Sequence, residues 1–211
     1  MPSRRDIVTF HDPPVPAGAS PWVAGAGPSP DVHVVAPDPD WPEAFASVAA
    51  RVRRALGWRA LLVEHVGSTA VPGLPAKPVI DVDLVVADPA DEVAYVPALE
   101  AEGFVLRVRE PWWFEHRLLR GSDPASHLHV FGPESPEVVR HRLFREWLRG
   151  NPDDRERYAA AKREASAASS TAGEHGMQYN ARKERVVRDI YDRAFAAMGL
   201  LDPTGTEEPG D

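Results

Sequence analysis

Residues 64–86 read EHVGSTAVPGLPAKPVIDVDLVV, and this stretch decides the fold. It follows an apolar run at residues 60–63 and ends in a second apolar run, VIDVDLVV, at residues 79–86. Apolar runs rich in β-branched residues are typical of buried strands. Between the two runs lie a Gly-Ser-Thr turn at residues 67–69 and a segment rich in proline and glycine. The stretch therefore predicts a strand, a turn and a second strand at the centre of an α/β domain.

Two carboxylates, Asp81 and Asp83, lie inside the second apolar run. Alternate residues of a strand point to the same face, so we expect the two side chains to emerge side by side. Two like charges in apolar surroundings are costly unless positive charge neutralises them. A divalent metal ion would do so, because Mg²⁺ is typically held by one or two carboxylates together with substrate phosphates. The alternative interpretation is an ion pair with nearby arginines, and we favour the metal.

The turn before the second run has the composition of an anion-binding loop. Gly67, Ser68 and Thr69 follow the first predicted strand, and such a turn lets backbone N–H groups and hydroxyls approach an anion closely. Lys77 precedes Pro78 at the start of the second strand, where it is either a phosphate contact or a solvated loop lysine. The stretch is not a P-loop, because GxxxxGK[ST] requires adjacent glycine and lysine.

This order of features, a Gly-Ser turn, a short gap and Asp-x-Asp on the next strand, resembles the signature of the nucleotidyltransferase (polymerase-beta-like) superfamily. The wording HVGSTAVPGLPAKPVIDVDLVV is similar to the GrpB family, small predicted members of that superfamily, and the similarity continues more weakly to about Arg188. The resemblance implies an α/β (α+β) fold, with a mixed, mostly antiparallel sheet packed by helices and with C-terminal helices. It also implies that Gly67 and Ser68 hold a triphosphate and that Asp81 and Asp83 hold Mg²⁺ or Mn²⁺.

In the nucleotidyltransferase pattern a third carboxylate lies on a later strand beside the aspartate pair. The predicted strand at residues 128–131 has no acidic residue, but His127 and His129 share one face there. A histidine in that place would ligate the metal or accept a proton; the alternatives are histidines satisfied within the sheet or a zinc site unrelated to nucleotides. Glu115, which shares a face with Arg117 on the preceding strand, is the nearby acid that would otherwise serve as the third carboxylate. We therefore predict His129 as catalytic, His127 and Glu115 as metal ligands, and Arg117 as a nucleotide contact.

Hydrophobic periodicity and turn residues predict the remaining elements. Strands are expected at residues 31–35, 104–108, 113–119 and 128–131, and helices at 40–57, 88–102, 135–149, 155–168 and 179–198. The helix at 135–149 carries four arginines, which we interpret as a solvated basic face. Lys183 lies near the start of the last helix. Because helix N-termini favour anions, and GrpB-like chains carry a similar Tyr/Lys pattern there, we predict that Lys183 reaches the nucleotide.

The chain has 211 residues and no cysteine, which excludes disulfides, zinc–cysteine sites and thiol catalysis. Its length suits one substantial domain with tails. We predict a flexible Pro/Gly-rich leader at 1–30, the domain at 31–200 and a flexible tail at 201–211. The net charge of −8 argues against general binding of nucleic acid, but not against a small anionic substrate. No apolar run approaches the roughly 18 residues of a membrane span, and the N-terminus lacks the apolar core of a signal peptide, so we expect no membrane partner and a cytoplasmic protein.

Together these features predict a Mg²⁺-dependent nucleotidyltransferase that moves a nucleotidyl group from an NTP to a small acceptor. One alternative is a non-catalytic nucleotide- or phosphate-binding module of the same fold. The other is a structural or regulatory protein in which the aspartate pair forms ion pairs with Arg117 and Arg142. The sequence indicates neither the acceptor, nor the base of the NTP, nor the oligomeric state.

Overall fold

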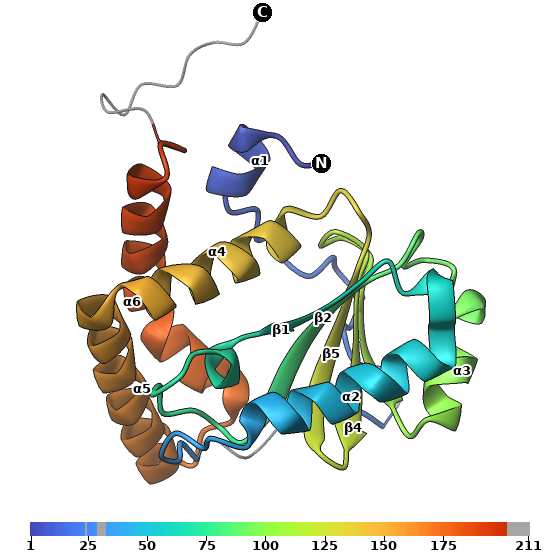
Figure 1. Cartoon of the computed structure of the whole chain (residues 1–211), viewed down its shortest axis with the longest axis horizontal. Helices are drawn as coiled ribbons and strands as arrows, with labels where there is room; N and C mark the ends of the chain where they lie inside the picture. The colour runs from blue at the N-terminus through green and yellow to red at the C-terminus, as the bar shows by residue number, and fades with distance from the viewer. Residues whose placement is uncertain (24, 29–32, 202–211) are drawn as a thin grey trace, which may run out of the picture.

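Five strands form one sheet in the computed structural model of the chain, which describes residues 1–23, 25–28 and 33–201 (Figure 1). The strands are β1 (Leu62–Val66), β2 (Ile80–Val85), β3 (Val105–Glu110), β4 (His116–Ser122) and β5 (Ala125–Phe131). They lie in the order β1-β2-β5-β4-β3. Strands β2 and β5 run parallel, and the other neighbours in this order are antiparallel. The prediction of a mixed, mostly antiparallel sheet is confirmed.

Helices cover both faces of the sheet. The α-helices are α1 (Arg4–Val8), α2 (Trp41–Leu56), α3 (Val96–Ala101), α4 (Pro136–Gly150), α5 (Pro152–Ala172) and α6 (Gly176–Ala197). Short 3₁₀ turns are η1 (Gly57–Arg59), η2 (Ser68–Ala70) and η3 (Glu92–Ala94). Figure 1 shows α2 and α3 on one side of the sheet, and α4, α5 and α6 on the other. Within the described residues, none of these helices is long and apolar enough to cross a membrane.

One face of the sheet forms the main core, because the strands alternate apolar and polar side chains. Ile80, Val82 and Leu84 of β2 point to this face and are buried. Val48 and Val52 of α2 pack in the same core and are fully buried. Each such side chain contributes about 1.5–3 kcal/mol when it leaves water. This core holds β2 rigidly and directs its alternate residues, including both aspartates, to the opposite face.

That opposite face is polar, and α4 neutralises part of it. Glu64 of β1 lies opposite Asp83 of β2. Arg145 of α4 donates to the Glu64 carboxylate at 2.7 Å and also donates to a backbone carbonyl of β1. Arg145 is 9% exposed and Arg140 is fully buried, so the interpretation of the arginines of this helix as a solvated face is wrong for these two. The partners are needed because an unpaired buried charge is costly.

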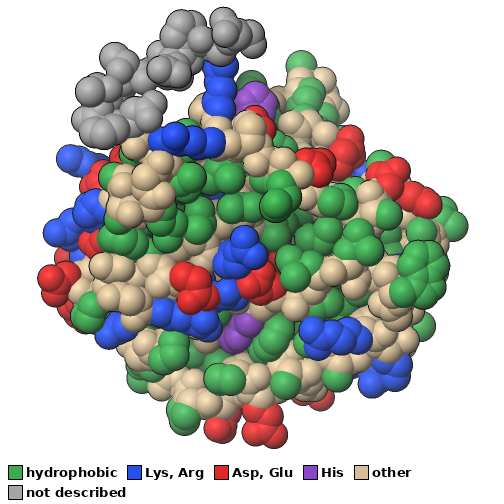
Figure 2. Space-filling view, turned by 45° about the horizontal axis from the view of Figure 1, so that its top comes forward, with side chains coloured by type: hydrophobic (Ala, Val, Ile, Leu, Met, Phe, Trp, Pro, Cys, Tyr) green, Lys and Arg blue, Asp and Glu red, His purple; other side chains and the backbone are tan. Residues whose placement is uncertain are grey.

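Charged side chains of both signs are mixed on one face of the molecule. On the face seen in Figure 2, Lys and Arg side chains lie among Asp and Glu side chains and do not gather in one basic area. This distribution differs from the basic stripe that marks a nucleic-acid-binding domain.

The N-terminal segment lies against the domain over its described residues. Arg140 donates to the backbone carbonyl of Ile7 at 2.8 Å, and its guanidinium lies 4.7 Å from the centre of the Phe10 ring. Phe10 also meets Tyr191 of α6 edge-on, with 5.1 Å between the ring centroids. Further along, Trp22 forms an antiparallel β-bridge with Val108, flanked by backbone hydrogen bonds of 3.0 and 2.8 Å. Phe10 and Trp22 thus anchor this segment to α6 and to the outer edge of β3.

Two elements of the structure differ from those predicted from the sequence. The helix predicted at 88–102 is divided into η3 and α3, because Pro97 fits only the first turn of a helix. The strand predicted at 31–35 begins outside the described residues, and Val35 forms a single bridge with Ala76. The predicted flexible tail lies, from residue 202 onward, outside the described residues.

Candidate functional site

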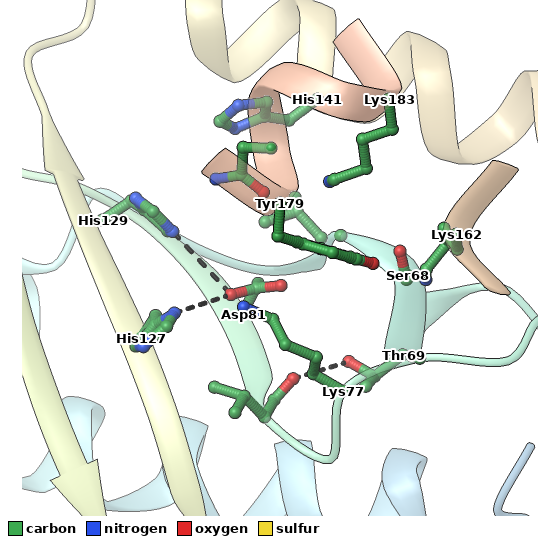
Figure 3. A pocket seen from close by; sticks show the side chains of 15 residues that line it. Ser68, Thr69, Lys77, Asp81, His127, His129, His141, Lys162, Tyr179 and Lys183 are labelled. Carbon is green, nitrogen blue, oxygen red and sulfur yellow. Dashed lines mark hydrogen bonds and ion pairs between the residues drawn. The ribbon is translucent and has the colours of Figure 1, made fainter. Parts of the chain in front are cut away.

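A cavity of about 360 Å³ lies between the polar face of the sheet and helices α4, α5 and α6. The turn after β1, the loop before β2, and strands β2 and β5 supply the side chains on the sheet side. Figure 3 shows Asp81, His127 and His129 on this side, with lysine side chains and Tyr179 around them. The volume lies within the usual range of small-molecule sites.

Asp81 of β2 and two histidines of β5 form a compact cluster, because β2 and β5 are paired. Asp81 lies opposite His127, and Asp83 lies opposite His129. Nδ1 of His127 is 3.2 Å and Nε2 of His129 is 3.9 Å from the same oxygen, Oδ1, of Asp81. Burial raises the pKa of the Asp81 carboxyl, but opposing interactions, of which the hydrogen bond from His127 is the largest, hold the pKa well below its ordinary value. These three side chains offer ligand atoms within 4.8 Å of one another, a spacing that can hold a metal ion.

The turn after β1 lies against Asp81, which explains the glycine at its start. Gly67 has a φ of 67°, in the left-handed region that favours glycine, and a Cβ atom there would collide with the Asp81 carboxylate. Ser68 and Thr69 line the cavity. The Thr69 hydroxyl already has partners, since it lies 3.0 Å from a ring nitrogen of His65 and 3.4 Å from a backbone carbonyl. Gly67 and Ser68 therefore remain the better-placed anion contacts of the turn.

All three lysines of the chain line this one cavity. The chain has 24 lysine and arginine residues, and only Lys77, Lys162 and Lys183 are lysines. The ammonium groups of Lys77 and Lys183 lie 5.2 and 5.1 Å from the centre of the Tyr179 ring, on either side of it in Figure 3. The Tyr179 hydroxyl is buried and has no hydrogen-bond partner among the described residues. Together these groups offer several donors to an anion with several oxygens.

Lys162 of α5 was not predicted from the sequence as a site residue. Its side chain is only 2% exposed, and burial, together with the charge of Lys183, lowers its pKa to about 6. A bound anion would favour its charged form. The sequence does hold a signal, because Tyr158, Lys162 and Ser166 recur at four-residue spacing. All three side chains are buried in the structure. Residues so spaced lie on one face of a helix, so Lys162 belongs to the inward face of α5.

Asp83 shares a strand face with Asp81 but does not line the cavity. Its carboxylate is fully buried and lies 3.0 Å from Nδ1 of His141 on α4. Burial lowers the pKa of His141, but the charge of Asp83 outweighs it and raises this pKa to about 9, so the ring is charged near neutral pH. The prediction that Asp81 and Asp83 share one strand face is correct. The predicted position of Asp83 at the metal is corrected, because His141 neutralises the Asp83 carboxylate. Sequence reasoning missed His141, which lines the cavity itself, because 58 residues separate it from Asp83.

Glu115 and Arg117 lie outside the cavity, which corrects their predicted place. Alternation along β4 puts Arg117 on the side of η3, where its Nε donates to Glu92 at 2.7 Å. The Glu115 carboxylate accepts from Arg117 at 3.2 Å and therefore faces the same way. The structure supports neither Glu115 as a third carboxylate nor Arg117 as a nucleotide contact. His127 and Lys183, in contrast, both line the cavity.

The fold and the site define a small α/β protein whose mixed sheet carries an Asp/His cluster beside a lysine-lined cavity. The model of the family described as GrpB protein matches residues 31–193, and the chain belongs to the GrpB family. The family resemblance seen in the sequence is thereby confirmed.

Several known proteins are similar to the chain over most of its length. The UPF0157 protein BH1888 of Halalkalibacterium halodurans is 50% identical over 159 residues, which cover 75% of this chain and 80% of that protein. Dephospho-CoA kinase of Mycolicibacterium paratuberculosis is 36% identical over 190 residues, which cover 78% of this chain but only 46% of the kinase. The crystal structure of the conserved protein GrpB from Enterococcus faecalis matches with a TM-score of 0.68 at 27% identity, covering 79% of this chain and 99% of that one. This likeness confirms the fold.

Proposed function

We propose that this cavity binds the phosphate groups of a nucleoside triphosphate together with a divalent metal ion. The observation that carries the proposal is the convergence of all three lysines of the chain on one cavity. Lysine carries a compact charge with three donors on a flexible stem, and it binds phosphate oxygens as a point charge. Everywhere else in the chain arginine takes the place of lysine.

The other side chains of the cavity have roles in the same arrangement. Lys77 and Lys183 would contact phosphate oxygens from two sides of the Tyr179 ring, and the buried Tyr179 hydroxyl would donate to one of those oxygens. Gly67 allows an oxygen to approach the backbone of the turn, where Ser68 adds a hydroxyl. Asp81, with the two histidines beside it, would hold the metal ion, for which the family resemblance implies Mg²⁺ or Mn²⁺.

The reaction we propose is nucleotidyl transfer to a small acceptor, the chemistry of the nucleotidyltransferase superfamily. The acceptor oxygen forms a bond to the α-phosphorus, and the bond between that phosphorus and the bridging oxygen of the β-phosphate breaks. Pyrophosphate leaves, and the proton of the acceptor hydroxyl passes to water. Lysines placed around the phosphates would stabilise the charge that develops on them.

A second candidate function is binding of a nucleotide or phosphate without turnover. It is favoured by the pairing of Asp83 with His141, which leaves Asp81 as the one carboxylate among the described residues that line the cavity. We do not propose kinase activity for this chain, although the mycobacterial relative is named as a kinase. The chain covers less than half of that protein, and it lacks the P-loop sequence GxxxxGK[ST].

Thermal unfolding tests the proposed binding. We expect at least one of ATP, GTP, CTP and UTP, with Mg²⁺ or Mn²⁺, to raise the melting temperature by several degrees, because a ligand at a hundred times its Kd adds about 2.7 kcal/mol. The rise should be lost in Lys183→Met and Asp81→Asn. It should persist in Arg185→Met, which removes an exposed positive charge from the same helix. Equal shifts in Lys183→Met and wild type, or no shift with any nucleotide, would refute the proposal. Pyrophosphate release with candidate acceptors then separates transfer from binding alone.

A further inference from the structure

A chain of three side chains leads from the end of β3 to the Asp/His cluster. A carboxylate oxygen of Glu110, the last residue of β3, lies 2.7 Å from Nδ1 of His116, the first residue of β4. Nε2 of His116 lies 3.1 Å from Nδ1 of His129 on β5. The two imidazole rings are stacked with 5.4 Å between their centroids, and His116 is only 4% exposed. Strand register keeps the first two of these side chains in contact, since Glu110 and His116 are direct partners in the β3–β4 ladder.

The direction of each hydrogen bond follows from what each group can donate. A carboxylate only accepts, so the ring proton of His116 lies on Nδ1 and faces Glu110. His116 is buried, which disfavours a charged ring, and a neutral imidazole has a single N–H; Nε2 of His116 therefore carries a lone pair and accepts from Nδ1–H of His129. Nε2 of His129 is then left without a proton. This nitrogen is the one that faces Asp81.

Two acceptor atoms therefore face each other at the cavity. Nε2 of His129 and Oδ1 of Asp81 are 3.9 Å apart, which is beyond hydrogen-bond distance. Nδ1 of His127 lies 3.2 Å from the same oxygen. Two ligands of one metal ion lie roughly 3–4 Å apart when each metal–ligand bond is about 2.1 Å. The cluster thus has both the spacing and the free lone pair that a metal ion uses.

We propose that Glu110 and His116 are positioning residues that hold His129 in its Nδ1–H tautomer, and that the resulting Asp81–His127–His129 site selects a Zn²⁺-like transition-metal ion over Mg²⁺. Imidazole suits zinc, iron, copper and nickel, whereas Mg²⁺ prefers oxygen ligands. A hydrogen bond to the outer ring nitrogen orients a histidine ligand and strengthens it. The inference rests on the proposed function in placing a metal ion at Asp81, and it names the class of that ion.

Nitrogen-15 NMR of the histidine rings tests the tautomer without any substitution. The full-length protein is stripped of metal and measured near neutral pH, and the His129 signals are assigned by their loss in His129→Gln. We expect the Nδ1–H tautomer of His129. An Nε2–H tautomer, or a doubly protonated ring, overturns the proposal.

Titration calorimetry with ZnCl₂, CoCl₂ and MgCl₂, in the absence of nucleotide, tests the metal class. We expect one Zn²⁺ per chain, bound at least about tenfold more tightly than Mg²⁺. Glu110→Ala should weaken Zn²⁺ binding by about 10–100-fold. Glu110→Gln keeps an acceptor oxygen for His116 and should retain the tautomer and most of the affinity. Glu100→Ala, which removes an exposed carboxylate from α3, is the matched control.

The titration tests this inference independently of the proposed function. Mg²⁺ binding as tight as Zn²⁺ binding, or wild-type Zn²⁺ affinity in Glu110→Ala, overturns it. Selective Zn²⁺ binding in a protein that no NTP stabilises supports it while the proposed function fails. NTP binding that depends on Mg²⁺ or Mn²⁺, without preferential Zn²⁺ binding, overturns the inference while the proposed function stands. Circular dichroism shows whether Glu110→Ala is folded; if it is not, the tautomer of the wild-type protein decides.

Discussion

Nδ1 of His141 lies 3.0 Å from the fully buried carboxylate of Asp83, and this pair joins α4 to the polar face of the sheet. Asp81, two residues earlier on the same strand face, reaches the cavity instead. The covering helix therefore separates two carboxylates that have the same local sequence surroundings. Asp83 therefore has a structural role, whereas Asp81 remains accessible to a ligand.

Stability should fall as the pH rises through the pKa of His141. This pKa is raised from 6.5 to about 9 by the Asp83 charge, which outweighs burial. The charged ring therefore stabilises the folded state fully below about pH 6.5, and the contribution is lost between about pH 6.5 and 9. We expect a loss of about 3 kcal/mol across this window. Urea unfolding of wild type and His141→Gln over the same pH range measures it, and a decline of equal size in both would show that another group titrates.

Lys162→Met should stabilise the protein and weaken anion binding. Burial and Lys183 lower the pKa of Lys162 from 10.5 to about 6, so near neutral pH folding removes a proton that the unfolded chain keeps. Methionine fills a similar space without that cost, and we expect the free energy of unfolding near pH 7 to rise by up to about 5 kcal/mol, because each pH unit below 10.5 is worth about 1.4 kcal/mol. The gain should shrink as the pH approaches 10.5, where the unfolded lysine is also neutral. Thermal unfolding with and without pyrophosphate measures both effects; a variant less stable than wild type near pH 7 would count against them.

Gly67→Ala should damage the cavity although it adds only a methyl group. The new Cβ would meet the Asp81 carboxylate, and the φ of 67° disfavours any side chain. We expect the free energy of unfolding to fall by roughly 1–3 kcal/mol and the nucleotide-induced shift to disappear. Gly73→Ala is the matched control, because Gly73 also has a positive φ, of 78°, but no atom lies within 4 Å of its Cβ position. Equal behaviour of the two variants would show that the Asp81 contact is unimportant.

Arg140→Met should destabilise the protein more than Arg142→Met on the same helix. The buried guanidinium pairs with Glu137 and donates to backbone carbonyls of residues 6, 7 and 9. Its loss leaves the buried Glu137 carboxylate with the more distant ring of His141, 4.0 Å away, and breaking a buried ion pair costs about 3–5 kcal/mol. Arg142→Met, an exposed change on the same helix, should stay within about 0.5 kcal/mol of wild type. Chemical denaturation compares the two, and limited proteolysis should show earlier cleavage of the N-terminal segment in Arg140→Met alone.

The parts of the site that depend on local rules were predictable from the sequence. Strand alternation placed Asp81 and Asp83 on one face, and it did the same for His127 and His129. The positive φ of Gly67 belongs to the turn itself. For these residues, the neighbours along the chain are enough to determine the direction of the side chain.

The remaining parts of the site depend on how elements far apart in the sequence pack against one another. Helical spacing shows that Lys162 faces inward, but only the packing of α5 against the sheet brings it to the cavity. His141 could not be matched to Asp83 without the position of α4. Arg117 was misplaced because both faces of β4 carry polar and apolar side chains, so alternation does not reveal which face meets the cavity.

The bridge between Trp22 and Val108 has a consequence for association of the folded chain. Strand β3 is the last strand on its side of the sheet, and an uncovered outer strand presents unpaired N–H and C=O groups to other molecules. The N-terminal segment occupies that edge by backbone hydrogen bonds, although it precedes residues 31–193, which match the family. A chain shortened to the family region would keep the cavity but expose this edge. The segment therefore leaves fewer unpaired backbone groups on β3 for another molecule to pair with.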